Sequence, residues 1–72
     1  MTFKQRCEIT TKLIGPYWLS KVPIALREKT TRKRYANPHL ALRDLRALKL
    51  DPAKYYGADL CDGRGTIIAE LE

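Results

Sequence analysis

Apolar residues recur at helical spacing near the start of the chain. Four residues at positions i, i+4, i+7 and i+11 would share one face of a helix: Phe3, Cys7, Thr10 and Ile14. Gly15 permits the left-handed residue that often ends a helix, and Pro16 prevents its continuation. This pattern predicts a helix over residues 3–14.

A second apolar stripe, with stronger end signals, follows in the middle of the chain. Asn37 is a favourable N-cap residue, and Pro38 suits the first helical position, where no backbone N–H is needed. The apolar residues that follow have helical spacing: Leu40, Ala41, Leu42, Leu45 and Leu48. We predict a helix over residues 37–50, with Ala41, Leu42, Leu45 and Leu48 as its buried stripe and Leu40 beside that stripe.

The stretch between the two stripes is rich in large apolar residues but is interrupted by prolines. Pro16 and Pro23 divide it into short pieces. We expect a turn over residues 16–21, followed by another helix that starts at Pro23 and reaches about Arg34. The basic end of that helix carries no apolar stripe, so packing would hold only its front end.

The last fifteen residues are acidic and rich in turn formers. Residues 61–65 read CDGRG, a turn cluster, and residues 66–72 read TIIAELE. The latter segment could be a strand if residues 17–22 or 58–61 pair with it, and is otherwise loose. The predicted fold is therefore mainly α: a small single domain of two to three short helices, with a short β segment as an option. Residues 1–57 would form a compact basic helical domain and residues 58–72 a loose acidic C-terminal tail.

Length and composition limit the classes of protein that fit. A chain of 72 residues allows one small domain with little room for a deep pocket. No apolar run approaches the roughly 18 residues of a membrane span, and the charged start is unlike a signal peptide. The two cysteines, Cys7 and Cys61, give no disulfide framework. We expect a reduced, cytoplasmic protein that is a monomer and contacts no membrane.

Residues that could support catalysis or metal binding are few. His39 is the single histidine, and no nucleophile or orienting acid accompanies it at a recognisable spacing. Cys7, His39 and Cys61 lack the closely spaced ligand pairs of zinc sites. The sequence predicts a protein that is not an enzyme, with no catalytic residues, no cofactor and no metal.

Positive charge is concentrated in the first half of the chain. Residues 1–36 contain nine Lys and Arg against two Glu, and residues 27–34 read REKTTRKR. Such a run is often only a solvated face, but it also suits an anionic partner, either nucleic acid or an acidic protein surface. A helix-turn-helix reading is also open, although the start of the 37–50 helix offers few side chains for base recognition.

As a whole, the chain resembles small early bacteriophage proteins that regulate transcription by binding the host bacterial RNA polymerase, of the type found in a Xanthomonas phage. The resemblance covers the basic portion, MTFKQRCEITTKLIGPYWLSKVPIALREKTTRKRY, and the acidic end, YYGADLCDGRGTIIAELE. It rests on overall character and on no signature motif. A phage inhibitor of a host defence that targets nucleic acid would share the same features.

The resemblance implies a function in the cytoplasm of a bacterial host. The protein would bind the large subunits of RNA polymerase, displace the promoter-recognition (sigma) factor and so inhibit initiation, with antitermination as a further effect. Nucleic acid could be contacted within that complex. From charge and position, the partner-binding residues would be Lys4, Arg6, Lys12, Tyr17, Trp18, Arg27, Lys29, Arg32, Lys33 and Arg34.

Overall fold

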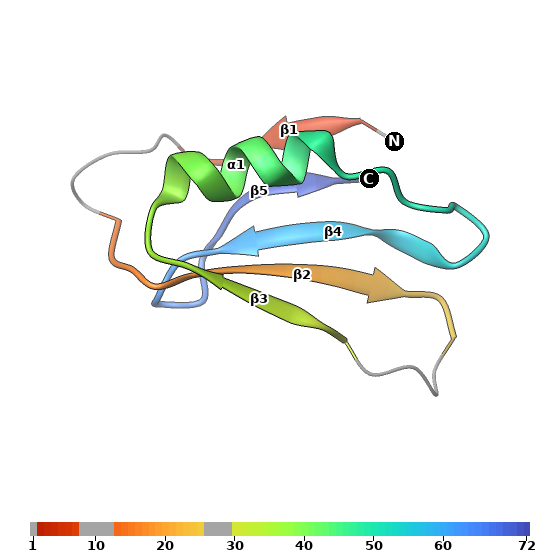
Figure 1. Cartoon of the computed structure of the whole chain (residues 1–72), viewed down its shortest axis with the longest axis horizontal. Coiled ribbons are helices and arrows are strands. Elements are labelled where there is room, and N and C mark those ends of the chain that lie inside the picture. Colours follow the sequence, from red (N-terminus) through yellow and green to blue (C-terminus); the bar gives the residue numbers. More distant parts are fainter. Residues whose placement is uncertain (1, 8–12, 26–29) are drawn as a thin grey trace.

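The computed structural model, which describes residues 2–7, 13–25 and 30–72, is mainly β. Its strands are β1 (Phe3–Gln5), β2 (Tyr17–Pro23), β3 (Arg32–Tyr35), β4 (Tyr55–Cys61) and β5 (Ile67–Leu71). Among the described residues they form one antiparallel sheet in the order β1-β5-β4-β2-β3. The helix α1 (Pro38–Ala47) lies across one face of this sheet (Figure 1). The prediction of a mainly α fold is therefore wrong.

Strand β2 occupies the stretch for which a turn and a helix were predicted. Tyr17 and Leu19 are buried under α1, while Trp18 and Ser20 alternate to the opposite face. This period of two is the signal of a strand, and the prolines at either end conceal it. The predicted turn over 16–21 is wrong, and so is the helix from Pro23 to Arg34 wherever that stretch is described; residues 26–29 lie outside the described part.

The predicted helix over residues 3–14 is also replaced by a strand at its start. Phe3 pairs with Leu71 and Gln5 with Ala69, so β1 forms an edge of the sheet. Residues 8–12 of the predicted helix lie outside the described part of the chain. A strand of three residues is too short to show the period of two. The helical spacing of residues 3–14 therefore favours a helix in the sequence.

The acidic end of the chain lies in the middle of the sheet. Strand β5 pairs with β4 on one side and with β1 on the other, and Ile68 and Ala69 are fully buried. The expected loose tail is wrong, whereas the option that residues 58–61 pair with the last segment is confirmed. Residues 58–72 thus supply most of two central strands, and the predicted boundary after residue 57 falls inside β4.

The helix predicted at 37–50 is confirmed, with its end three residues earlier. The Asn37 side chain accepts a hydrogen bond of 2.8 Å from the His39 backbone N–H. Ala41 and Leu45 are fully buried against the sheet, and Leu42 is nearly so. Leu48 caps the helix and is half-buried, while Leu40 is 44% exposed and lies outside the stripe.

The register divides the molecule into a helix side, which faces α1, and an open side. Tyr17, Leu19 and their neighbours Ala58 and Leu60 face the helix. Gly57 on β4 lies close to the end of β5, since a Cβ there would overlap the carbonyl oxygen of Leu71. In the described ranges, no helix has the length and apolar character needed to cross a membrane.

Candidate anion-binding surface

The cations of β1 are neutralised within the molecule. The Lys4 ammonium lies 3.0 Å from a Glu72 carboxylate oxygen, and Arg6 pairs with both Glu70 and Glu72. The hydrogen bond from Lys4 lowers the pKa of Glu72, and the Glu70 hydrogen bond and charge raise the pKa of Arg6. The carboxylates of Glu70 and Glu72 therefore already neutralise the cations at this edge.

The cations of β3 lie at the opposite edge of the sheet, away from Glu70 and Glu72. Arg32 and Arg34 face the open side, across from Ser20 and Trp18, whereas Lys33 faces the helix side. All three are exposed. Within the described part of the chain, no ion pair joins any of them to a carboxylate.

The predicted partner-binding residues thus do not form one surface. Lys4 and Arg6 lie at one edge, and the β3 cations lie at the other. Tyr17 is only 5% exposed and belongs to the core, where its hydroxyl donates to the Leu13 carbonyl. Trp18 is half-buried on the open side. The remaining three predicted residues lie outside the described part of the chain: Lys12, Arg27 and Lys29.

The helix side carries a cluster of cations of which only Lys33 is among the predicted partner-binding residues. Lys21, Lys33 and Lys49 surround a shallow depression of about 390 Å³ beside α1. Lys21 lies over the Tyr55 ring, 5.8 Å from its centroid, and Lys33 lies 5.2 Å from that of Tyr35. These contacts hold the stems in place. Asp44 lines the same depression, and no ion pair within 4.0 Å joins it to any of the three lysines in the described ranges.

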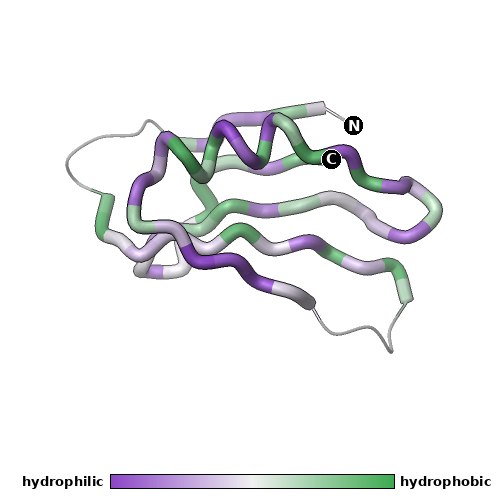
Figure 2. Tube along the Cα trace, in the orientation of Figure 1, coloured by the Kyte–Doolittle hydropathy of each residue, from purple (hydrophilic) through white to green (hydrophobic). Residues whose placement is uncertain are grey.

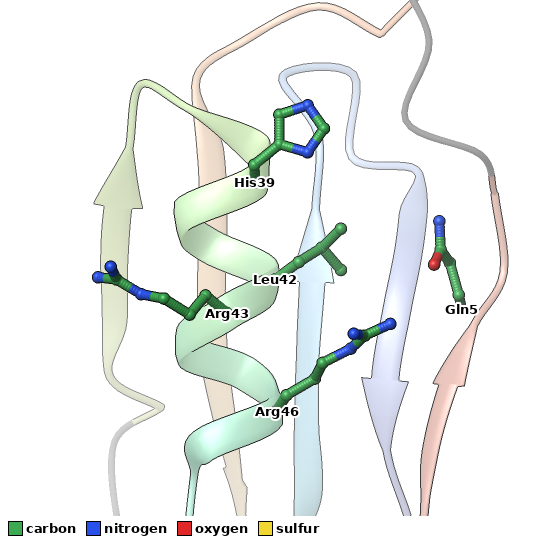
Figure 3. A pocket seen from close by; sticks show the side chains of 5 residues that line it. All are labelled: Gln5, His39, Leu42, Arg43 and Arg46. Carbon is green, nitrogen blue, oxygen red and sulfur yellow. The ribbon is translucent and has the colours of Figure 1, made fainter.

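A groove of about 540 Å³ extends the positive charge to the other flank of the helix. In Figure 3, His39, Leu42 and Arg46 project from α1 on the side that faces Gln5 of β1, while Arg43 points away from them. The Arg46 guanidinium stacks on the Phe3 ring at 4.6 Å from its centroid. This stacking on the Phe3 ring fixes the plane of the guanidinium at the margin of the groove.

Asp44 is the one acidic residue in the sequence of α1, and its charge is largely occupied. Its carboxylate accepts a 2.6 Å hydrogen bond from the Tyr35 hydroxyl and lies 3.4 Å from Arg43. The hydrogen bond from Tyr35, with Arg43 and Lys33 nearby, lowers the pKa of Asp44. Burial and the same carboxylate raise the pKa of Tyr35 to about 12. The contact ties β3 to α1.

One sequence signal could have revealed the helix-side cations. Arg43, Arg46 and Lys49 are spaced three apart and fall off the apolar stripe, so the sequence places all three away from the buried face of the helix region. Lys21 follows Leu19 at the strand period and therefore faces the same side of the sheet. Figure 2 shows the hydrophilic residues along β3 and at intervals on α1.

Within the described ranges, no three His, Cys, Asp or Glu residues group in a way that could hold a metal ion. No family model, curated protein or solved structure matches this chain.

Proposed function

We propose that the protein binds nucleic acid through the phosphate backbone, using five helix-side cations: Lys21, Lys33, Arg43, Arg46 and Lys49. The observation that carries the proposal is that the described carboxylates neutralise few of them. Among the described residues, only Arg43 of this set pairs with a carboxylate, and that carboxylate also accepts from Tyr35. Each cation that meets a phosphate releases counterions, which favours binding at low salt.

The surface supports binding that does not depend on base sequence. The described part of the chain has one helix, whose inner face is packed on the sheet, so it has no free recognition helix of the helix-turn-helix kind. Three of the five cations lie over aromatic rings, Lys21 over Tyr55, Lys33 over Tyr35 and Arg46 over Phe3. The five cations are spread over the two sides of α1. Such an arrangement suits phosphates along a backbone better than the edges of a single base pair.

A purely structural reason for cations also exists at β3. Lys and Arg on an edge strand prevent edge-to-edge pairing between molecules. That reason applies to Lys33 but not to Arg46 or Lys49, which lie on and just after α1. The helix-side set therefore requires a further explanation, which an anionic partner supplies.

The test is a titration of fluorescently labelled duplex and single-stranded oligonucleotides at several salt concentrations. We expect binding near about 50 mM salt that weakens linearly on a log–log plot. Lys33→Glu and Arg46→Glu should each lower the affinity about tenfold and reduce the salt slope by about 1. Lys54→Glu, in the turn before β4, changes the net charge equally and is the matched control.

Two results would overturn the proposal. One is the absence of any binding by the folded protein at low salt. The other is an equal loss of affinity for Lys54→Glu and for the two helix-side reversals, because that would indicate an effect of net charge alone. Circular dichroism of each variant checks that the fold is kept.

A second candidate, which follows from the resemblance in the sequence, is binding to the large subunits of host RNA polymerase. The favouring observation is that β3 is an edge strand with exposed cations, which can accept a strand of a protein partner that has acidic neighbours. The proposed effect is displacement of the sigma factor and inhibition of initiation, with antitermination in addition.

Size exclusion of the protein with polymerase core enzyme, in the presence of nuclease, separates this candidate from the first. Comigration that survives nuclease and is lost in Arg34→Glu supports the polymerase interface. Separate elution of the two proteins at about 50 mM salt, where charge attraction is weakly screened, rejects it.

A further inference from the structure

The open side contains a depression of about 350 Å³ that lies between the β3 edge and the turn after β4. Its size is within the range of small-ligand sites. The ring of Trp18, the hydroxyl of Ser20 and the guanidinium of Arg32 belong to its lining. The thiol of Cys61 and the turn after β4 complete it. None of these belongs to the helix-side cations.

The sheet register sets the relative positions of these side chains. Trp18 on β2 lies between Arg34 of β3 and Cys61 of β4. Ser20, two residues along, lies between Arg32 and Asp59. A ring and a hydroxyl on the central strand are thus flanked by two guanidinium groups on the outer strand.

The turn that closes the depression is held by its own hydrogen bonds. The Asp62 carboxylate is buried and accepts from the backbone N–H groups of Arg64 and Thr66, at 3.0 and 2.9 Å. The Gly63 N–H donates to the Ile14 carbonyl at 2.6 Å, and a Cβ at Gly63 would lie 2.6 Å from the carbonyl oxygen of Gly15. The wall opposite Arg32 is therefore fixed before a ligand arrives.

We propose that this depression binds a nucleotide, with its base against Trp18 and its phosphate at Arg32. Stacking on an aromatic side chain is the usual way in which an unpaired base is held, and guanidinium groups match phosphate oxygens in geometry. Arg34, across from Trp18, lies beside the path that the next phosphate of a strand would take.

The charges around the site set one orientation for the nucleotide. Asp59 and Asp62 lie toward β4 and the turn, so the phosphate is disfavoured there and favoured at the β3 edge. Burial, followed by the charge of Asp59, raises the pKa of the Cys61 thiol, which stays neutral at physiological pH and can contact a base. The base thus points toward the turn and the phosphate toward Arg32.

This inference deepens the proposed function by naming what the open side would recognise: an unpaired nucleotide, as opposed to duplex backbone. The same chemistry has two sources, a free mononucleotide and an unpaired base within a strand. The two surfaces use different residues, so each can fail without the other.

Trp18 is the single tryptophan of the chain and serves as the probe. Its fluorescence is followed during titration with AMP, with UMP, with a short oligo-dT and with inorganic phosphate. We expect quenching by nucleotide or oligo-dT but not by phosphate alone. Quenching by the mononucleotides indicates a site for free nucleotide, and quenching by oligo-dT alone indicates an unpaired base in a strand.

Variants separate stacking from charge. Arg32→Ala should weaken the quenching titration about tenfold, whereas Lys54→Ala, which removes the same charge outside the site, should leave it unchanged. Trp18→Leu should weaken the binding of labelled oligo-dT about tenfold or more and leave labelled duplex unaffected. Lys33→Glu, which breaks the helix-side surface, should not change the titration with mononucleotide.

Three outcomes would overturn the inference: no quenching by any nucleotide or by oligo-dT, equal quenching by phosphate alone, or unchanged oligo-dT binding by Trp18→Leu. If duplex binding persists in that case, the helix-side proposal stands without the pocket. If duplex binding is absent while Trp18 responds to nucleotide, the pocket stands alone.

Discussion

The two edges of the sheet carry similar charges in the sequence and different ones in the folded protein. At β1, Lys4 and Arg6 meet the carboxylates of Glu70 and Glu72, which β5 brings alongside. At β3, Arg32 and Arg34 face an open side where the neighbouring strand offers Ser20 and Trp18. A count of cations along the chain therefore says little about surface potential until the strand order is known.

The helix side extends this contrast. Three of its five cations lie over the rings of Phe3, Tyr35 and Tyr55, which hold them without neutralising their charge. By contrast, Lys4 and Arg6 are held by carboxylates, which neutralise their charge. The first arrangement keeps charge available to a partner and the second uses it for folding. Four substitutions test this difference, in decreasing order of expected effect.

Leu45→Ala should break the helix side. Leu45 is fully buried between α1 and the sheet, so its truncation should lower the free energy of unfolding by about 2–5 kcal/mol. Loosening of α1 would also disperse the cations that it holds. Urea unfolding followed by circular dichroism gives the change in stability. Exposed Leu40→Ala is the control and should cost much less; equal losses would contradict the packing described.

Gly57→Ala should break the β1 edge. The added Cβ would lie 2.0 Å from the Leu71 carbonyl oxygen, so β4 and β5 must separate. We expect a loss of about 3 kcal/mol in the free energy of unfolding. Gly65→Ala is a comparison in which the new Cβ meets nothing within 4 Å and only the positive φ of 82° opposes it. A Gly57→Ala variant as stable as the parent would refute the close approach.

Glu70→Gln should sharpen the contrast by leaving Arg6 without its main partner. Glu70 is 8% exposed, and loss of this charged hydrogen bond should lower the free energy of unfolding by about 1 kcal/mol. The pKa of Asp59, which burial and the charges of Glu70 and Glu72 raise, should fall toward its ordinary value. NMR titration of the Asp59 carboxyl measures that change. An unaltered pKa of Asp59 would contradict the prediction, because it would mean that the charge of Glu70 does not act on Asp59.

Asp44→Asn should increase the affinity of the helix side for oligonucleotides by up to about fivefold, because a carboxylate leaves the surface. The variant should be less stable than the parent at neutral pH. Since the pKa of Asp44 is lowered in the folded state, its contribution is present above the ordinary aspartate range and is lost as the pH falls through the lowered value. The difference in Tm between the parent and Asp44→Asn should therefore shrink as the pH is lowered. A difference that stays constant with pH would indicate a change in packing and not the loss of a charge.

The sequence was sufficient for α1 and insufficient for the sheet, for a physical reason. The N-cap Asn37, Pro38 and the apolar stripe are local signals, and α1 forms where they predict it. The strands are short, and their stability comes from partners distant in sequence, such as Phe3 with Leu71. Local spacing could not reveal those pairings, so the apolar residues of β1 were read as part of a helix.

The candidate site follows the same division. Arg32, Lys33 and Arg34 were selected as a run, and the run is exposed, but the strand period sends Lys33 to one face and its neighbours to the other. The role of Arg46 depends on Phe3, which lies beside it only because β1 joins the sheet next to β5. Such proximity is tertiary and has no local signature.

The position of β5 has a consequence for how the protein is made. The sheet needs residues 67–71 between β1 and β4, so the earliest and latest described strands can join only after synthesis has passed residue 71. Until then Lys4 and Arg6 lack the carboxylates of Glu70 and Glu72, because these follow in the last residues to be made. Completion of the last strand therefore lowers the net positive charge of the chain where β1 and β5 meet, and it leaves the helix-side cations exposed.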